Sequence, residues 1–113
     1  MAEKSKIEWI EIPNYNGYLI SKEGRIFSIK TNKLIKHLRN KTKHHYVFLY
    51  DGYGKSKKEY VHRLVLTTFV GTKKYPEFEC RHIDGNPDNN FLENLEWGSK
   101  SINQRDRIKH GTI

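Results

Sequence analysis

Three polar residues in the C-terminal half have side chains suited to acid–base and metal chemistry: His82, Asn94 and Asn103. Asn94 lies twelve residues after His82, and Asn103 lies twenty-one residues after it. Histidine titrates near neutral pH, which suits a general base. The amide oxygen of asparagine is a ligand for hard divalent cations such as Mg2+. The residue types therefore indicate a base and a metal ligand within one short motif.

Turn and strand signals predict the elements that must position these side chains. His82 belongs to a short strand, and residues 84–87 are two turn dipeptides, Asp-Gly and Asn-Pro. Residues 95–97 alternate apolar, polar and apolar, as a short strand does. Ser99 is a suitable N-cap for a helix over residues 100–110, which a glycine would end. We expect strand, loop, strand and helix, with Asn103 on the helix facing the strands.

This stretch resembles the HNH nucleases of the ββα-metal (His-Me finger) type, in particular the group found in bacteriophages and intron-encoded homing endonucleases. The resemblance rests on the histidine, the Asp-Gly turn, the Asn-Leu-Glu-Trp strand and the spacing of the two asparagines. It implies that His82 is the general base, that Asn94 fixes the loop and that Asn103 binds the metal. It also implies a DNA endonuclease with one divalent ion, Mg2+, for which Mn2+ can substitute.

The residue types agree with phosphodiester hydrolysis. This reaction needs a base that takes a proton from water, and His82 has the side chain for that role. It also needs positive charge beside the developing phosphorane and the leaving oxygen, which a hard cation supplies. Asn103 offers an oxygen ligand for such a cation, and the amide of Asn94 can hold the intervening loop.

Arg81 departs from the family pattern, because many relatives carry an acidic residue, Asn or His at this position as a second metal ligand. A guanidinium cannot coordinate a cation, although it can bind a phosphate. Three residues could replace the missing ligand: Asp84, Asp106 or His110. His110 lies about 10 Å along the helix from Asn103, which is far for one shared ion. The departure leaves open a DNA-binding protein with a catalytically decayed finger.

The N-terminal half contains short strands separated by glycine turns. Strands are predicted at residues 8–12, 18–21, 25–29, 33–38 and 46–50, with a further one at 58–61. Together they predict a small antiparallel β-meander. It resembles a nuclease-associated module that often precedes HNH domains, on the residues Trp9, Ile12, Tyr18, Ile20-Ser21, Gly24-Arg25 and Ser28.

An amphipathic helix is predicted over residues 61–70. Its apolar face consists of Val61, Leu64, Val65 and Phe69. His62 at its start is expected to be structural, with a hydrogen bond to nearby backbone. The fold class is therefore predicted as α+β. Residues 1–58 form the meander, with expected DNA contact, and residues 59–113 form the HNH ββα-metal domain.

Composition limits the partners of the chain. Its 113 residues carry a formal net charge of +8, with a pI of about 9.6. This charge indicates a polyanionic partner, either nucleic acid or an anionic membrane surface. With the resemblance, we expect double-stranded DNA, although a structural RNA-binding module remains an alternative. The residues expected to contact DNA are Lys36, Arg39, Arg63, Arg81 and Arg105.

Two further features bear on the setting of the protein. The single cysteine, Cys80, excludes an internal disulfide and a zinc site built from several cysteines. Only 35% of residues are hydrophobic, mean hydropathy is −0.85, and no apolar run reaches membrane-spanning length. We expect no membrane partner and a monomer or weak dimer. The expected location is the cytoplasm of a bacterial host, for a protein that a phage could encode.

Overall fold

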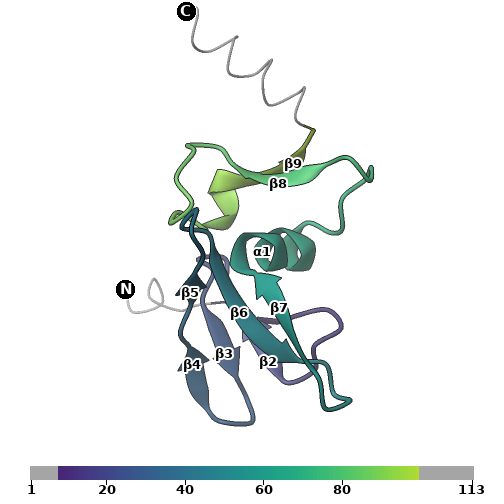
Figure 1. The fold of residues 1–113 in the computed structure, drawn as a ribbon. Coiled ribbons are helices and arrows are strands. Elements are labelled where there is room, and N and C mark those ends of the chain that lie inside the picture. The colour runs from purple at the N-terminus through teal and green to yellow at the C-terminus, as the bar shows by residue number, and fades with distance from the viewer. Residues whose placement is uncertain (1–7, 100–113) are drawn as a thin grey trace, which may run out of the picture.

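The computed structural model describes residues 8–99, which form three small antiparallel sheets packed around one α-helix (Figure 1). The first sheet has the order β1-β2-β3-β4. Its strands are β1 (Ile10–Glu11), β2 (Tyr18–Ile20), β3 (Ile26–Ser28) and β4 (Lys33–Ile35). The second sheet has the order β5-β6-β7. Its strands are β5 (Leu38–Arg39), β6 (His45–Tyr50) and β7 (Ser56–Tyr60).

The helix and the last two strands complete the described part of the chain. Helix α1 (Val61–Phe69) follows β7 directly, and β8 (Glu79–His82) pairs antiparallel with β9 (Leu95–Gly98). A short 3-10 turn, η2 (Leu92–Asn94), leads into β9. The α+β prediction is confirmed. Among the described residues, no helix is long and apolar enough to cross a membrane.

One strand prediction is wrong in an informative way. A single strand was expected over residues 33–38, but β4 ends at Ile35, and Leu38 pairs with Tyr46 of β6. His37 lies between the two strands, half-buried, with its Nδ1 atom 3.0 Å from Nδ1 of His45. The chain therefore leaves the edge of the first sheet after Ile35 and joins the second sheet at Leu38. The expected meander is therefore divided into two sheets.

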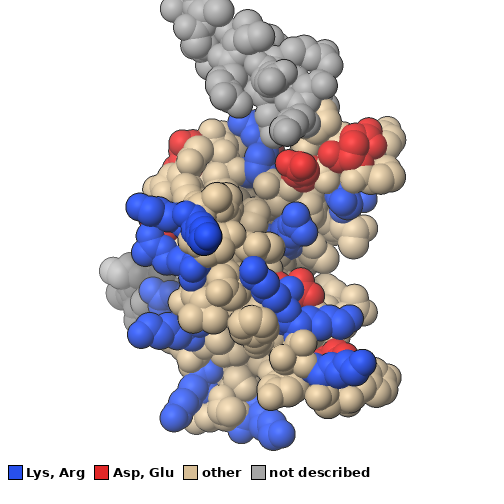
Figure 2. All heavy atoms as spheres, viewed as in Figure 1, with Lys and Arg blue, Asp and Glu red and all other residues tan. Residues whose placement is uncertain are grey.

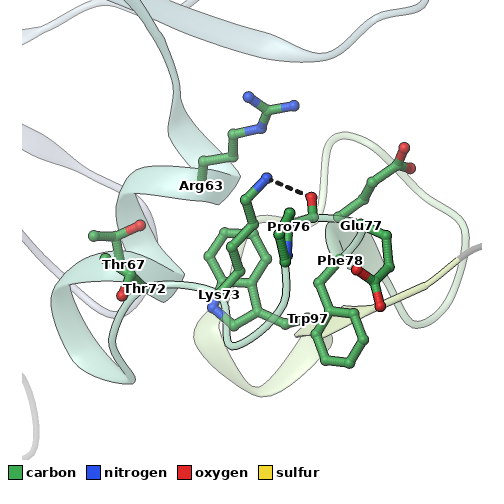
Figure 3. Close-up of a pocket in the computed structure, with 9 residues that line it drawn as sticks. Arg63, Thr67, Thr72, Lys73, Pro76, Glu77, Phe78 and Trp97 are labelled. Carbon is green, nitrogen blue, oxygen red and sulfur yellow. Dashed lines mark hydrogen bonds between the residues drawn. The ribbon is translucent and has the colours of Figure 1, made fainter.

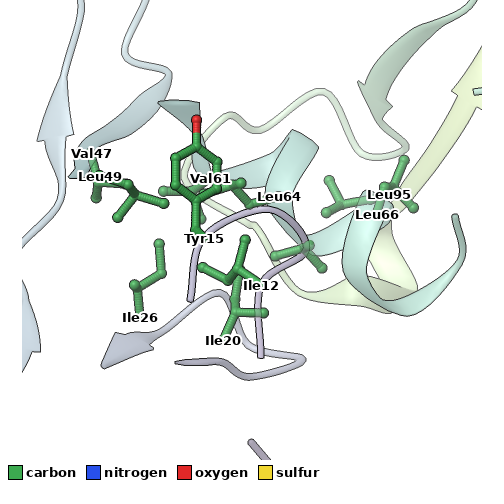
Figure 4. Packing of buried hydrophobic residues seen from close by; sticks show 11 residues of the cluster. Ile12, Tyr15, Ile20, Ile26, Val47, Leu49, Val61, Leu64, Leu66 and Leu95 are labelled. Atoms are coloured by element: carbon green, nitrogen blue, oxygen red, sulfur yellow. The ribbon is translucent and has the colours of Figure 1, made fainter. Parts of the chain in front are cut away.

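Helix α1 lies at the centre of the hydrophobic core (Figure 4). The predicted apolar face is confirmed, because Val61, Leu64 and Val65 are buried and Phe69 packs against the core. The first sheet and the loop before β2 add Ile12, Tyr15, Ile20 and Ile26; the remaining buried apolar residues are Val47, Leu49, Leu66 and Leu95. One core thus joins the two sheets and the β8–β9 pair through the helix.

Polar contacts also join the N-terminal segment to the rest of the chain. The Tyr15 hydroxyl donates a hydrogen bond to the Glu59 carboxylate on β7. Burial and this carboxylate raise the pKa of Tyr15 well above its ordinary value, so the phenol stays protonated. β7 crosses position 58, where the sequence suggested a domain boundary. The division of the chain into residues 1–58 and 59–113 stays a prediction.

The turn between β2 and β3 packs against the loop after β8. Gly24 has φ +89, and a Cβ atom placed on it would lie 3.2 Å from Cβ of Asn90 and 3.3 Å from a methyl group of Val61. The backbone N–H of Leu92 donates to the carbonyl of Lys22 at 2.8 Å. The turn therefore needs glycine for its conformation and for its contact with Asn90.

We expect Gly24→Ala to destabilise the fold more than Gly52→Ala. Both glycines have φ near +90, so each alanine incurs the left-handed penalty of about 1–2 kcal/mol. Only Gly24 is packed, whereas nothing lies within 4 Å of a Cβ atom on Gly52. Overpacking should add about 1–3 kcal/mol for Gly24→Ala. Urea unfolding of the two variants measures the difference, and equal losses of stability would contradict the contact.

Candidate functional site

His82 ends β8, opposite Leu95 of β9. Its Nε2 atom lies 2.8 Å from Oδ1 of Asn90, a buried residue of the loop between these strands. Its ring stacks on the ring of His62 from α1, with centroids 4.8 Å apart and an interplanar angle of 28°. The histidine predicted as the base is thus fixed by a hydrogen bond at one edge and by a ring on one face.

The side chain of Asn94 lies inside the same loop. Its Oδ1 accepts from the backbone N–H of Asp84 at 3.1 Å. Its Nδ2 donates to the Asp84 carboxylate and to the carbonyl of Asn89, each at 2.9 Å. The Asn94 carbonyl also accepts from the N–H of Ile83 at 2.8 Å. These contacts join the two ends of the loop and hold His82 at the start of it.

Asp84 has a structural environment. It accepts from the N–H of Asn86, then from the amides of Asn89 and Asn94, and these bonds lower the pKa of its carboxyl. The carboxylate shapes the turn that the Asp-Gly dipeptide predicted. With three donors already on its oxygens, Asp84 is a poor candidate for the missing metal ligand.

Arg81 faces Glu96 across the β8–β9 pair. Its guanidinium donates a hydrogen bond to the Glu96 carboxylate, and the two side chains form an ion pair. The sequence expectation considered Arg81 as a phosphate contact and did not consider Glu96. Glu96 is the partner of Arg81 because of the pairing register of β8 and β9, and this register cannot be read from the sequence alone.

Three histidines from separate elements gather at the site. The ring of His44 lies 5.4 Å from that of His62 and 5.7 Å from that of His82. Burial, then the neighbouring histidines, lowers the pKa of His44 and lowers that of His62 to about 3. Both rings are therefore neutral at neutral pH. They form an uncharged wall beside His82.

His62 differs from its expected role. The sequence favoured a hydrogen bond from His62 to nearby backbone, but its buried Nδ1 atom has no hydrogen-bond partner among residues 8–99. Its own carbonyl instead accepts from the Cys80 thiol at 3.4 Å. Burial raises the pKa of this thiol to about 12, so Cys80 is a packing residue.

The hairpin of β5 and β6 reaches the loop after His82 (Figure 1). Asp88 accepts a hydrogen bond from Nε2 of His45 at 2.8 Å and pairs with Arg39 at 3.3 Å. The bond from His45 is the main cause of the lowered pKa of Asp88. At the tip of the hairpin, Asn40 Oδ1 accepts from the N–H groups of Thr42 and His44. This turn directs His44 toward His82.

The basic residues expected to contact DNA lie in different surroundings. Lys36 is exposed shortly before β5, and Arg39 is exposed on β5 itself. Arg63 is exposed on α1, with its guanidinium carbon 5.7 Å from the ring centre of Tyr60. Figure 2 shows that Lys and Arg side chains predominate over the face formed by the two larger sheets. Arg105 lies outside the described residues, as do Asn103, Asp106 and His110.

A hollow of about 430 Å³ lies between α1 and the connection that leads into β8 (Figure 3). Arg63, Lys73, Phe78 and Trp97 are among the residues that line it. Trp97 closes one side and donates its indole N–H to the Gly71 carbonyl at 2.9 Å. His82 is not among the lining residues, so this hollow is separate from the histidine cluster.

The described residues provide only part of a metal site. Residues 8–99 contain no group of three or more His, Cys, Asp or Glu side chains that could hold an ion. At the position before His82 stands Arg81, and the nearby carboxylate of Glu96 is already paired with it. The donor set thus fits a divalent cation only if the other ligands come from residues beyond 99, from water or from substrate.

The residues that complete the site lie where local sequence patterns are weak. Asn89 and Asn90 are adjacent in the loop, and the sequence does not indicate which of the two side chains lies toward His82. His44 and His45 were visible as a doublet, but their different contacts were not: the ring of His44 lies near His62 and His82, whereas His45 bonds to Asp88. Asp88 joins His45 to the loop from 43 residues away in the chain.

A strand ending in histidine, a loop held by an asparagine amide and an antiparallel second strand define the hairpin of a ββα-metal nuclease finger. Comparison with known proteins gives the same class. Residues 59–105 match the HNH endonuclease family, and residues 8–50 match the NUMOD4 motif. The chain thus carries an HNH endonuclease match in its C-terminal half and a NUMOD4 match before it.

Two of the similar proteins come from phages, and two others from Acanthamoeba polyphaga mimivirus. DNA endonuclease I-HmuI of Bacillus phage SP01 is 39% identical over 109 residues, which cover 95% of this chain and 61% of that protein. H-N-H endonuclease F-TflII of Escherichia phage T5 is 36% identical over 99 residues, covering 87% of this chain and 49% of that protein. The chain thus spans less than two thirds of the length of either relative.

A solved structure agrees with the described fold. A chain of the HNH homing endonuclease I-HmuI, solved for its DNA binding and cleavage, superimposes with a TM-score of 0.80 at 38% identity. The match covers 94% of this chain and 60% of that chain. The two larger sheets and the β8–β9 pair therefore lie within one shared architecture.

The neutral, buried ring of His62 should make the free energy of unfolding depend on pH. The pKa of His62 is about 3 in the folded chain against an ordinary 6.5, so the unfolded chain binds more protons below pH 6.5. Stability is then full above pH 6.5 and declines as the pH falls, by up to about 1.4 kcal/mol per pH unit for one proton. Urea unfolding between pH 7 and pH 5 should show a smaller decline for His62→Phe than for wild type. Equal declines would contradict a neutral buried His62.

Proposed function

We propose that this protein is a metal-dependent DNA endonuclease that hydrolyses phosphodiester bonds, of the phage or homing type. The observation that carries the proposal is His82 at the end of β8, next to a loop fixed by Asn94, within the segment that matches the HNH family. Residues 59–113 would be the nuclease domain. Residues 1–58 would form a module that contacts DNA. The phage relatives favour a phage gene and action in the cytoplasm of a bacterial host.

In this proposal His82 is the general base. It takes one proton from a water molecule: an O–H bond of water breaks and an N–H bond forms on the imidazole. The water oxygen attacks the phosphorus, and the P–O bond to the leaving oxygen breaks. Asn94 does not touch the reacting atoms and acts by holding the backbone around Asp84 and Asn89. His62 covers one ring face with an uncharged surface.

The cation of this proposal is Mg2+, with Mn2+ as a substitute. When bound, it would supply positive charge to the phosphate and the leaving oxygen. HNH nucleases are generally metal-dependent, and Asn103 would be the protein ligand here. Mg2+ retains several waters and uses substrate phosphates, so a sparse protein site suffices. Arg81 would present guanidinium donors to the phosphate, with Glu96 offsetting part of its charge. Asp106 and His110 remain candidates for a second ligand.

Double-stranded DNA is the proposed substrate, bound by a monomer or weak dimer. Support comes from the +8 net charge and from the β5–β6 hairpin, which carries Arg39 and meets the loop of His82 at Asp88. Basic side chains near His82 support the proposal that DNA binds on this side of the chain. Lys36, Arg63, Arg81 and Arg105 would contribute further contacts, largely to phosphates.

The test of catalysis is the nicking of supercoiled plasmid with Mg2+ or Mn2+. His82→Ala should lower the rate by about 10²–10⁴-fold or more while DNA binding persists, because the variant loses only the proton acceptor. EDTA should stop the wild-type reaction. Cleavage by the variant at nearly the wild-type rate would contradict the assignment of His82 as the general base. Binding without cleavage by the wild type would favour the alternative of a decayed finger, which Arg81 keeps open.

The test of DNA binding is its salt dependence. A plot of log K against log salt should be steep, with a slope of about −0.9 for each phosphate contact. Lys36→Gln should flatten the slope by about one contact. Arg39 is less suitable for charge reversal, because an acidic residue there would face Asp88. Lys74→Gln, an exposed lysine of the α1–β8 connection, is the matched control. Unchanged slopes in both variants would reject Lys36 as a contact.

A further inference from the structure

The two nitrogens of the His82 ring have different surroundings. Nε2 lies 2.8 Å from Oδ1 of Asn90, whereas Nδ1 makes no hydrogen bond to another described residue. An amide oxygen can only accept, and neutral imidazole carries one N–H and one lone pair. In this arrangement Nε2 bears the proton and donates it to Asn90. Nδ1 then bears the lone pair, as a base toward water requires.

Asn90 itself is held in place from the NUMOD4 segment. The residue is 4% exposed, and its Cβ atom and carbonyl oxygen would lie 3.2 and 3.3 Å from a Cβ atom on Gly24. Two residues later, the Leu92 N–H donates to the Lys22 carbonyl at 2.8 Å. The β2–β3 turn is thus a platform against which Asn90 packs. A side chain so confined has few rotamers available.

The other groups that face His82 do not provide this orientation. His62 from α1 and His44 from the β5–β6 hairpin contact the ring as neutral aromatic neighbours. Asp84, in the loop of His82, uses its carboxylate for Asn86, Asn89 and Asn94. Among the described residues, Asn90 alone makes a hydrogen bond to the His82 ring.

We propose that Asn90 is a positioning residue that fixes His82 as its Nε2–H tautomer and directs Nδ1 to the attacking water, with the Gly24 turn holding Asn90 in place. This inference rests on the proposed function of His82 as the base. After proton transfer the imidazolium keeps its bond to Asn90, because Oδ1 accepts from Nε2 in both states. The other tautomer would present an N–H to the water and could not accept its proton.

The tautomer can be read without any cleavage assay. Long-range 1H–15N spectra of the 15N-labelled full chain, above the titration of the ring, distinguish the protonated nitrogen from the bare one. Subtraction of the spectrum of His82→Gln assigns the signal. We expect Nε2 of His82 to carry the proton. A protonated Nδ1 would mean that the Asn90 amide is turned over, and it would overturn the inference.

Two substitutions of Asn90, to Asp and to Leu, test whether this residue orients the His82 ring or only packs against it. Asn90→Asp keeps an accepting oxygen and adds negative charge beside the ring. It should preserve the tautomer and raise the titration midpoint of His82 by about one pH unit or more. The acidic limb of the cleavage profile should move to higher pH by the same amount, because the base must be deprotonated. Asn86→Asp makes the same chemical change in the same loop, but Asn86 contacts Asp88 instead of His82. The titration midpoint of His82 should therefore shift less in Asn86→Asp than in Asn90→Asp.

Asn90→Leu has similar volume and no acceptor. This variant should leave His82 as a mixture of its two tautomers. Its kcat should fall by between about 10-fold and 10⁴-fold, which is the range seen when an orienting partner is lost or the wrong tautomer forms. KM should change little. Wild-type tautomer, pH profile and kcat in Asn90→Leu, together with an inactive His82→Ala, would refute the role of Asn90 and leave the nuclease proposal intact. Full cleavage by His82→Ala would refute the nuclease mechanism, whatever the tautomer.

Discussion

The packing of α1 against all three sheets is the constraint on which the rest of the structure depends. The helix contacts β2, β6, β7, β8 and β9, and its buried residues hold the two larger sheets and the β8–β9 pair in one core. None of these sheets is large enough to bury a face alone, since their strands have two to six residues. His62 is part of the same helix, so the element that makes the core also sets one wall of the site.

The sequence could predict what local signals determine. Glycine turns, alternation and the apolar face of α1 led to most strands, the helix and the histidine–asparagine motif. The strand predicted over residues 33–38 was wrong because Lys33–Ile35 pair with β3 whereas Leu38 and Arg39 pair with β6, a tertiary choice that local signals do not contain. For the same reason Asn90, Glu96 and Asp88 were not predicted. Their partners lie eight to 49 residues away, beyond the reach of any periodic pattern.

The site also concentrates polar groups in an otherwise thin core. His62, Asn90 and Asn94 are all buried, and the two asparagines use their amides within the loop or on His82. The His62 ring lacks a partner on Nδ1 among the described residues and depends on stacking and neutrality. Buried polar groups lower the stability of the fold unless they form hydrogen bonds. The three buried side chains are therefore more easily explained by their role in orienting His82 than by a contribution to stability.

The contact between Gly24 and Asn90 has a consequence for the evolution of this architecture. A NUMOD4 segment and an HNH domain look like separate cassettes in a sequence, and phage genomes could exchange them between relatives. In this chain the two segments meet at Gly24, where a Cβ atom would lie 3.2 Å from Cβ of Asn90. A side chain larger than glycine at position 24 would press on the loop that follows His82, so an HNH domain exchanged into this chain would need a loop that fits this turn. Neither segment alone contains the whole arrangement around the histidine.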